Sequence, residues 1–365
     1  MDDNTTLPII SYRYLCMCQY LPAVFRVRTS FRLVEMRLYT LFITCLGVAV
    51  SANKSINPSY VSNISGGNRV KNPSPWHAGI YTKTTEPYKQ ICGGTLVTKC
   101  AVISAAHCFS HDGLAPLAFN YAVAVGKMYR PWNDYHDEGV QKADVIAIRI
   151  PPRYQGAIAN FQDDIAVVIA ATEFYLTPYV EPACLSFKPD FDEEQLRDGQ
   201  LGVVVGWGLT GENSPASQVL QSASLPNVAI EKCIKQSPTS FRSSITGDKI
   251  CAGYNNGTAV CRGDSGGGLV YSAFVNYRLL YFLRGVVSTS PTSENMCNIY
   301  SWATFTHLIK HEHFIKSVVP DVEQFCVQTY GTTFTKLERI QNEETCQCPK
   351  AYEVILSDKV IKVFL

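Results

Sequence analysis

The 365-residue sequence lacks an excess of charge of either sign, and it lacks an apolar run long enough to cross a membrane. Its 32 Lys and Arg residues balance 31 Asp and Glu residues, which leaves a formal net charge of +1. This balance argues against nucleic acid or an anionic membrane as a partner. With 46% hydrophobic and 17% charged residues, the composition also argues against extended disorder and predicts a folded core.

The apolar run at residues 38–50 is too short for a membrane span, which needs roughly 20 residues. Met36 and Arg37 precede the run, and small residues at 50–52 follow it. A positive start, a short apolar stretch and a small-residue cleavage site are typical of a secretory signal peptide. We therefore predict a signal peptide at 36–52 and a secreted, extracellular protein, with a buried core helix as the alternative.

Cysteine is abundant, with 14 residues, so disulfides and metal sites are the two alternatives. The signal peptide favours disulfides, because they persist in oxidising compartments. Acceptor patterns for N-glycosylation at Asn53, Asn63 and Asn256 agree with secretion. The predicted segments are an upstream stretch that is untranslated or an extended n-region, the signal peptide, a short propeptide, a strand-rich domain and a tail of unassigned role (1–35, 36–52, 53–63, 64–326 and 327–365).

Short apolar, β-branched runs separated by Gly, Pro, Asn and Ser fill the main domain. Residues 121–126 (YAVAVG), 164–170 (DIAVVIA) and 201–207 (LGVVVGW) are examples. Each run has the length of a strand and ends at turn residues, so the pattern predicts an all-β sandwich or barrel. Residues 303–316 keep a helical period and predict a helix near the end of the domain.

Two polar features are interpreted as solvent-exposed. The acidic segment 190–198 is predicted to be a loop. His307, His311 and His313 have near-helical spacing, and two histidines four residues apart are able to bind a metal. Because no acidic or cysteine ligand is in register, we interpret them as an exposed helix face and expect no metal or other cofactor.

Three short segments supply the groups needed for nucleophilic catalysis. They contain His107 (SAAHC), Asp164 (DDIAV) and Ser265 (GDSGGG). A serine attacks a peptide bond when an imidazole accepts its proton, a carboxylate orients that imidazole, and backbone N–H groups bind the oxyanion. The glycines around Ser265 permit a tight turn with accessible N–H groups. The chain order His, Asp, Ser argues against an α/β-hydrolase, in which the serine comes first.

These segments resemble the signature blocks of chymotrypsin-fold serine endopeptidases, and CGGTLV at 92–97 and GWG at 206–208 fit the same family. The resemblance covers roughly residues 64–320. It implies two six-stranded antiparallel β-barrels with a C-terminal helix, and hydrolysis of peptide bonds through an acyl-enzyme. A narrower similarity to the insect modular serine proteases that start haemolymph cascades lies in residues 122–145, 150–166 and 286–297.

The resemblance implies a role for each matching residue. His107 would act as general base and then as general acid. Asp164, rather than Asp163, would orient the imidazole, and Ser265 would be the nucleophile. The N–H groups of Gly263 and Ser265 would form the oxyanion hole.

The resemblance also locates the residues around the substrate. Ser288 would support the triad carboxylate. Ala259 stands at the floor of the specificity pocket, where a trypsin-like enzyme would have Asp. Thr289 replaces the usual Trp of the substrate-pairing strand, and Ser290 stands where Gly usually opens the pocket. We therefore expect a restricted pocket for small to medium, uncharged side chains and low general activity.

A zymogen is a further implication of the resemblance. Ile64 (ISGG) would become the new N-terminus on activation, and its α-ammonium would form a buried ion pair with Asp264 that shapes the oxyanion hole. Asn63 precedes Ile64, where cascade zymogens commonly have Arg or Lys. We therefore expect activation by an enzyme that is not trypsin-like, or autocatalysis, and a glycan on Asn63 would hinder it.

The family disulfides provide a check on the alignment. Three are implied, namely Cys92–Cys108, Cys233–Cys251 and Cys261–Cys297. A fourth is missing at both ends, where Gly202 and Tyr271 stand. Cys184 often tethers the propeptide in the family, but residues 53–63 contain no cysteine, so we predict a Cys100–Cys184 disulfide instead. An odd thiol then remains among Cys326, Cys346 and Cys348.

The sequence therefore predicts a secreted serine endopeptidase, made as a zymogen, that acts in an extracellular immune cascade. Its partners would be a protein substrate, namely a downstream protease zymogen, and a serpin-type inhibitor. A catalytically weak or inactive homologue that serves as a regulatory scaffold is the rival interpretation, which Thr289, Ser290 and Asn63 favour and the intact triad opposes. A digestive protease is a third interpretation.

Overall fold

The computed structural model describes residues 68–331, apart from gaps at 71–73, 111–115, 210, 212–213 and 294–295, and it also describes 351–356 and 359–364. The side chains of 292–297 and of the residues from 327 onward lie outside this description. The predicted signal peptide and propeptide also lie outside it, and with them Asn63 and Ile64.

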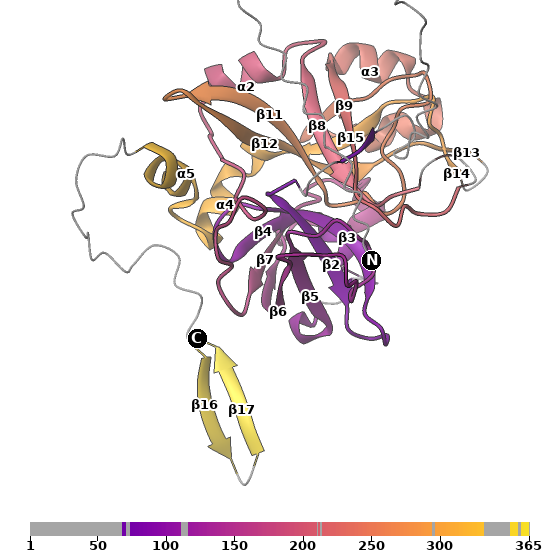
Figure 1. Cartoon of the computed structure of the whole chain (residues 1–365). Helices are drawn as coiled ribbons and strands as arrows, with labels where there is room; N and C mark the ends of the chain where they lie inside the picture. The colour runs from indigo at the N-terminus through magenta and orange to yellow at the C-terminus, as the bar shows by residue number, and fades with distance from the viewer. Residues whose placement is uncertain are drawn as a thin grey trace, which may run out of the picture. The chain divides into compact units, whose positions relative to one another are not determined.

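Two closed six-stranded antiparallel β-barrels form the main domain, which confirms the all-β prediction (Figure 1). The first barrel has the strand order β2-β3-β4-β7-β6-β5. Ile80, Val123 and Val168 are fully buried in its core. Their β-branched side chains favour the strand conformation. Its strands are His77–Thr82 (β2), Lys89–Leu96 (β3), Ala101–Ser104 (β4), Tyr121–Val125 (β5), Gln141–Arg149 (β6) and Ala166–Ala170 (β7).

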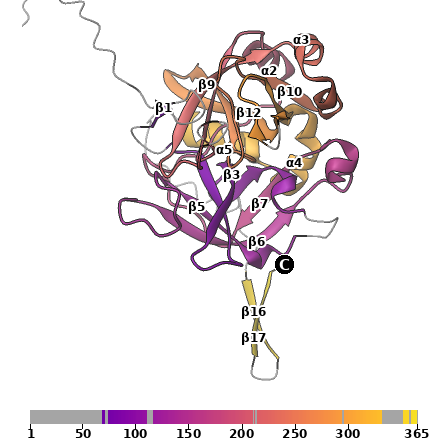
Figure 2. The ribbon, with the colours of Figure 1, turned by 90° about the vertical axis from the view of Figure 1, so that its right-hand side faces the viewer.

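The second barrel closes because β8 pairs with both β9 and β11. Its strands are Leu201–Gly206 (β8), Gln221–Val228 (β9), Lys249–Ala252 (β10), Gly268–Val275 (β11), Arg278–Thr289 (β12) and Ala303–His307 (β15). A short strand, Asn68–Arg69 (β1), adds to the edge of β9. The two barrels are neighbours in the turned view as well (Figure 2), and Leu283 and Val286 of the second barrel join the core of the first.

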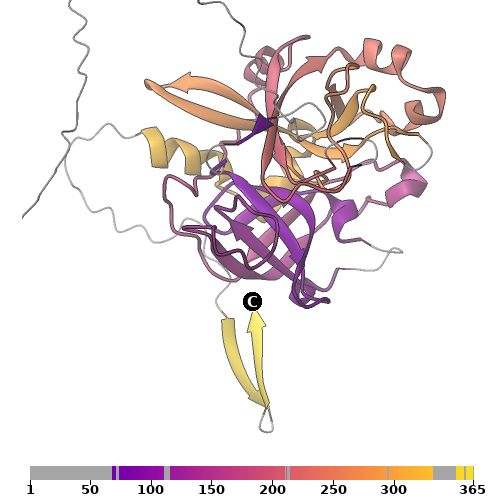
Figure 3. The ribbon, with the colours of Figure 1, turned by 45° about the vertical axis from the view of Figure 1, so that its right-hand side comes forward.

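A long hairpin, formed by β11 and β12, extends beyond the second barrel (Figure 3). Its two-residue turn, Asn276-Tyr277, has φ values of 50° and 63°. Positive φ at both turn residues is the geometry that matches the twist of antiparallel strands. The hairpin contributes to the site, because β11 begins directly after the turn that contains Ser265, and β12 brings the chain back beside it.

The helices of the described residues are short, and the helix predicted at 303–316 begins later than expected. Residues 303–307 form β15, which pairs with β10 on one side and β12 on the other. Because the segment pairs on both sides, the backbone N–H and C=O groups of these buried residues are hydrogen-bonded. This stabilises a strand in spite of the helical spacing of the apolar residues. The helices are Pro189–Gln195 (α2), Ile230–Gln236 (α3), Glu312–Val318 (α4) and Val322–Gly331 (α5), and the 3-10 turn Leu308–His311 (η5) precedes α4.

Two segments predicted to be exposed are in fact buried in part. The acidic segment forms α2, and its Asp192 is only 6% exposed. The Arg284 guanidinium lies 3.3 Å from the Asp192 carboxylate, and the His307 ring lies 2.7 Å from it. His311, expected on a solvated helix face, is 5% exposed and contacts Asp248. In both places an opposite or hydrogen-bonding partner from another element compensates the burial of a polar group.

Disulfides join separate segments of the main domain. The structure contains Cys92–Cys108 and Cys233–Cys251, as the resemblance implies. Cys184 bonds to Cys326 of α5, so the predicted Cys100–Cys184 disulfide is wrong. Cys261 is disulfide-bonded, but the side chain of Cys297 lies outside the described residues, so that pairing stays a prediction.

The missing family disulfide is accounted for by a close packing of its two positions. A Cβ atom on Gly202 would lie 2.8 Å from the Tyr271 ring, so the ring occupies the space that the glycine leaves open. Helix α5 continues across residue 326, where the domain was predicted to end. Beyond it, Ala351–Leu356 (β16) pairs with Lys359–Phe364 (β17). Among the described helices, none has the length and hydropathy of a membrane span.

Candidate active site

His107 and Asp164 lie together because one follows strand β4 and the other precedes strand β7, and these two paired strands place both residues at the same end of the first barrel. Ser104, the last residue of β4, pairs with Ala166, the first residue of β7. His107 follows β4 in a 3-10 turn, Ala106–Cys108 (η1), and Asp164 lies two residues before β7. Both residues therefore lie at the same edge. Asp164 Oδ2 lies 2.8 Å from His107 Nδ1, and Asp164 Oδ1 accepts the backbone N–H of His107 at 2.9 Å.

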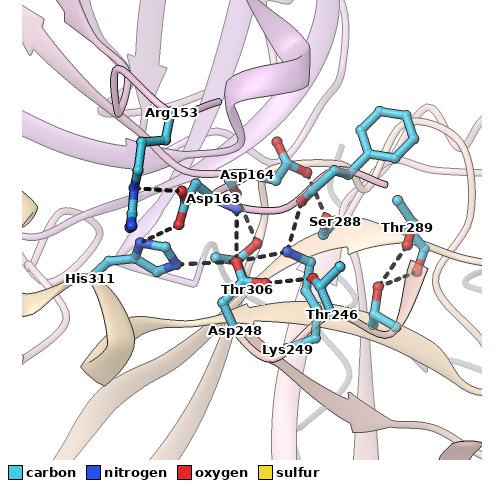
Figure 4. Close-up of polar contacts among 12 residues, drawn as sticks. Arg153, Asp163, Asp164, Thr246, Asp248, Lys249, Ser288, Thr289, Thr306 and His311 are labelled. Atoms are coloured by element: carbon cyan, nitrogen blue, oxygen red, sulfur yellow. Dashed lines mark hydrogen bonds and ion pairs between the residues drawn. The ribbon is translucent and has the colours of Figure 1, made fainter. Parts of the chain in front are cut away.

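The second barrel contributes two hydroxyl groups to the same carboxylate residue. Ser288, in the bulge of β12 between Val287 and Thr289, donates to Asp164 Oδ2 at 2.6 Å (Figure 4). Thr306 of β15 donates to the carbonyl oxygen of Asp164 at 2.8 Å. The Asp164 side chain is fully buried, and burial alone would raise its pKa. The charge of His107 and the hydrogen bonds from His107 and Ser288 outweigh burial and lower the pKa.

The imidazole of His107 is oriented by this pair. Its side chain is 22% exposed. Burial alone would lower the pKa of His107, but the charge of Asp164 and its hydrogen bond raise the pKa above the ordinary value, while Lys249 opposes them. With Nδ1 directed at the carboxylate, Nε2 is left as the proton acceptor of the neutral ring.

Ser265 lies in a glycine turn held between the two barrels. Its carbonyl oxygen accepts the N–H of Gly93 of β3 at 2.8 Å, and the next N–H, of Gly266, donates to Val287 at 2.9 Å. Gly266 has φ of 78°, and a Cβ there would lie 2.3 Å from Ser104 Oγ, so only glycine fits. These contacts place the turn against the ends of β4 and β12. Among the described residues, no hydrogen bond joins the Ser265 hydroxyl to His107, a contact that often forms only with substrate bound.

The backbone N–H groups of Gly263 and Ser265 have no acceptor within the described part of the chain. Gly263 has φ of 100° and a Cβ there would lie 2.9 Å from Gly208, so the position requires glycine. The carbonyl of Gly263 accepts a hydrogen bond at 3.2 Å from the side chain of Gln90, which is 8% exposed. Two free N–H groups beside a serine hydroxyl are able to stabilise an oxyanion.

Asp264 is a buried carboxyl group beside this turn. It is 2% exposed, and its two oxygens accept the N–H groups of Gly208 at 2.9 Å and Cys261 at 3.0 Å. Burial raises the pKa of Asp264 to about 6, although both hydrogen bonds lower it. The described residues give it no cationic partner. Glycines at 206 and 208 are required here, because a Cβ at either would lie 2.1 or 2.2 Å from the carboxylate.

Comparison with known proteins agrees with this geometry. The family model described as Trypsin matches residues 63–309. The chain belongs to the trypsin family. Clotting factor C of Tachypleus tridentatus is 33% identical over 237 residues, which cover 63% of this chain and 23% of that protein. Modular serine protease of Drosophila melanogaster is 30% identical over 259 residues, which cover 68% of this chain and 39% of that protein.

A further relative matches over more of its own length. Melanization protease 1 of Drosophila melanogaster is 30% identical over 281 residues, 72% of this chain and 66% of that protein. The chain thus spans less than half the length of clotting factor C and modular serine protease. What it shares with all three relatives is the trypsin-family domain.

The specificity residues expected for a trypsin-family protein are placed as follows. Ala259 is 3% exposed, and Ser290 is half-buried. Thr289 pairs with Thr304 of β15 across the strands, and their hydroxyl oxygens lie 2.7 Å apart. Thr289 is thereby anchored to β15, in the place where the resemblance expects a large indole.

Sequence reasoning missed several residues of this trypsin-family site. Thr306 donates a hydrogen bond to the carbonyl oxygen of Asp164, and Gln90 donates one to the carbonyl oxygen of Gly263. Both come from strands distant in sequence, and no sequence motif marks either residue. Lys249, whose side chain is 0% exposed, was also missed, although a Lys at the start of an apolar strand is a visible anomaly.

A buried cluster next to the trypsin-family site brings three potential metal ligands together. One ligand atom each of Asp163, Asp248 and His311 lies within 4.8 Å of the others. Lys249 lies 2.9 Å from Asp248, and Arg153 lies 3.3 Å from Asp163. Since an ammonium and a guanidinium already supply positive charge to these oxygens, we interpret the cluster as an ion network.

Proposed function

We propose that this trypsin-family protein is a serine endopeptidase that hydrolyses peptide bonds through an acyl-enzyme. The observation that most directly supports the proposal is the hydrogen-bonded pair of His107 and Asp164 at the edge where the turn of Ser265 meets the first barrel. Nε2 of His107 would accept the hydroxyl proton as Ser265 attacks the carbonyl carbon, and it would return that proton to the leaving amine.

The two free N–H groups would stabilise the charge that develops during attack. Those of Gly263 and Ser265 would donate to the oxyanion, and loss of one such donor typically costs about 3–4 kcal/mol of transition-state stabilisation. Gln90 would hold the Gly263 peptide from behind through its carbonyl. Ser288 would keep Asp164 ionised and oriented.

We further propose that the protein is made as a zymogen. Asp264 is buried, and among the described residues only backbone N–H groups donate to it, so its charged form is destabilised and its pKa is raised to about 6. An α-ammonium at Ile64, created by cleavage after Asn63, would enter and neutralise this carboxylate. A buried carboxylate gains more from such a partner than an exposed one does, which couples cleavage to the shape of the turn.

The relatives support a role in an extracellular proteolytic cascade. Their names are clotting factor, modular serine protease and melanization protease. Together with the predicted signal peptide and the disulfides, they support secretion, a protein substrate of the protease-zymogen class and control by a serpin-type inhibitor. Ala259, Thr289 and Ser290 support cleavage after small to medium, uncharged side chains.

Labelling with a fluorophosphonate probe tests the proposal, because only an activated serine reacts. The full chain is cleaved to expose Ile64, by an inserted protease site if necessary, and labelled beside Ser265→Ala and His107→Ala variants. We expect labelling of the cleaved parent alone. A cleaved, folded parent that does not label would refute the endopeptidase and favour a regulatory scaffold.

Sequencing the N-terminus of the naturally activated protein tests the zymogen proposal separately. We expect Ile64 as the first residue. A different first residue in a form that labels with the probe would refute the assigned cleavage site and leave the catalytic assignment standing.

A further inference from the structure

Lys249 presents a buried ammonium group close to the candidate triad. It begins β10, and its side chain is 0% exposed. Its Nζ donates to the carbonyl oxygen of Phe161 at 2.8 Å and to Asp248 Oδ2 at 2.9 Å. An ammonium at such depth is costly unless it is paired and hydrogen-bonded, and both conditions are met here.

The partners of Lys249 belong to the segment that delivers Asp164. Phe161 and Asp163 both have φ of 58°, a left-handed conformation that is unfavourable for residues other than glycine. Asp248 Oδ2 accepts the N–H of Asp163 at 2.9 Å (Figure 4), while Lys249 donates to the carbonyl oxygen of Phe161. The Asp248–Lys249 pair therefore holds both ends of the strained turn just before Asp164.

Other charged groups complete the surroundings of this pair. His311 of η5 lies 3.3 Å from Asp248 Oδ2 and 3.8 Å from Asp163 Oδ1. Arg153 lies 3.3 Å from Asp163, but its side chain is 82% exposed. Lys249 also lines a small cavity together with Asp192, Glu193 and His307.

Lys249 also acts on the imidazole through its charge. Its positive charge lowers the pKa of His107, against the effect of Asp164, which raises it. A general base must be unprotonated before it accepts a proton, so a nearby fixed cation extends the pH range in which His107 is competent. The same side chain thus has a geometric and an electrostatic effect on the triad.

We propose that Lys249 and Asp248 are positioning residues of the triad, which hold the turn at 161–163 so that Asp164 meets His107. The inference rests on the proposed endopeptidase function. It differs from a purely structural role, because a structural ion pair would support the fold without changing the protonation of the imidazole.

The test compares the full, cleaved chain with Lys249→Met, Lys249→Arg and the double variant Asp248→Asn/Lys249→Met. The double variant removes the carboxylate that Lys249→Met would leave buried without its ammonium partner, so we expect it to fold even where the single variant does not. We measure kcat and KM against pH with a peptide substrate. We also follow the titration of the His107 ring by ¹⁵N NMR, assigned with His107→Ala, which requires no activity.

We expect the acid limb of kcat/KM, and the midpoint of the His107 ring titration, to move to higher pH by about half a unit in Lys249→Met. The double variant loses a positive and a negative charge together, so its midpoint should move less, and its kcat reports the loss of the held turn. We expect kcat to fall about tenfold with KM changed by less than about twofold, as for a small displacement of a catalytic group. Lys249→Arg keeps the charge and should restore the titration midpoint.

Lys127 provides a matched control in the first barrel. Its side chain is 1% exposed and its ammonium is paired with Asp137. Asp137→Asn/Lys127→Met removes an equally buried pair, so it should lower stability but leave the His107 titration unchanged. An unchanged His107 midpoint in folded Lys249→Met, an unchanged kcat in Asp248→Asn/Lys249→Met, or the same changes in the control, would overturn the inference. An inactive parent would refute the proposed function, while the ring titration would still decide the role of Lys249.

Discussion

The uncleaved protein should become less stable as the pH rises through the range in which Asp264 ionises, and Asp264→Asn should remove this loss. The Asp264 carboxyl group is 2% exposed and accepts two backbone hydrogen bonds, from Gly208 and Cys261. Its pKa is about 6 in the folded chain, against an ordinary value of 3.8. Burial is the cause, since the charged form has lost its hydration.

The size and sign of the effect follow from linkage. A pKa raised by about 2 units corresponds to about 3 kcal/mol. Between about pH 4 and pH 6 the folded state holds the proton and the unfolded state does not, so the free energy of unfolding decreases as the pH rises through this window. Asn at position 264 is neutral throughout and resembles the protonated carboxyl group, so the variant should lack this component.

The assay is guanidinium unfolding of the single chain at about pH 4 and about pH 7, in a Ser265→Ala background that prevents self-cleavage. Other carboxyl groups change stability with pH in both proteins, so they cancel in the difference between the parent and Asp264→Asn. We expect Asp264→Asn to gain about 3 kcal/mol relative to the parent between the two pH values. Equal pH dependence in the two proteins would refute the argument from burial.

Cleavage before Ile64 should reverse this behaviour. If the new α-ammonium pairs with Asp264, the pKa of the carboxyl group falls, and ionisation then stabilises the folded state. The cleaved parent should therefore no longer lose stability between about pH 4 and pH 6 through this group, whereas cleaved Asp264→Asn should gain nothing from cleavage. An equal response of both proteins to cleavage would contradict the ion pair.

Three further predictions concern the site and the fold. Ser288→Ala removes a hydrogen bond to the charged Asp164 and should lower kcat/KM about tenfold or more; an unchanged value in peptide-substrate assays would argue against its supporting role. Replacing both Cys184 and Cys326 by Ser opens a loop with a sequence separation of 142. The free energy of unfolding should fall by about 3–5 kcal/mol, and a loss below about 1 kcal/mol in guanidinium titrations would contradict this. Ala259→Asp should introduce cleavage after Lys and Arg in a peptide library, and a library profile identical to that of the parent would refute its place at the pocket floor.

Much of the site was predictable because local sequence determines it. The glycines around Ser265 are needed wherever the chain has positive φ and close neighbours, so they signal the turn directly. The strands of β5 and β7 were visible as short β-branched runs between turn residues. Gly202 and Tyr271 were recognised as a joint replacement, and their contact in the barrel accounts for it.

The errors fall where a polar residue finds a partner far away in sequence. The acidic segment looked solvated, but Asp192 contacts Arg284, which lies on another strand. His311 likewise looked exposed, but it packs beside Asp163 and Asp248. Composition and hydrophobic periodicity indicate which residues favour contact with water. They do not indicate whether a charged group from an element distant in sequence compensates the burial of a polar residue.

By itself, the sequence determined the chemical groups, their chain order, the strand-rich fold and the glycine turn, because each of these depends on side-chain chemistry or on local backbone geometry. Only the tertiary structure decided that Cys184 bonds to Cys326 and that a buried Lys249 holds the turn before Asp164. The physical reason is that the stability of a buried charge or thiol depends on what surrounds it, and those surroundings come from segments that meet only when the barrels close.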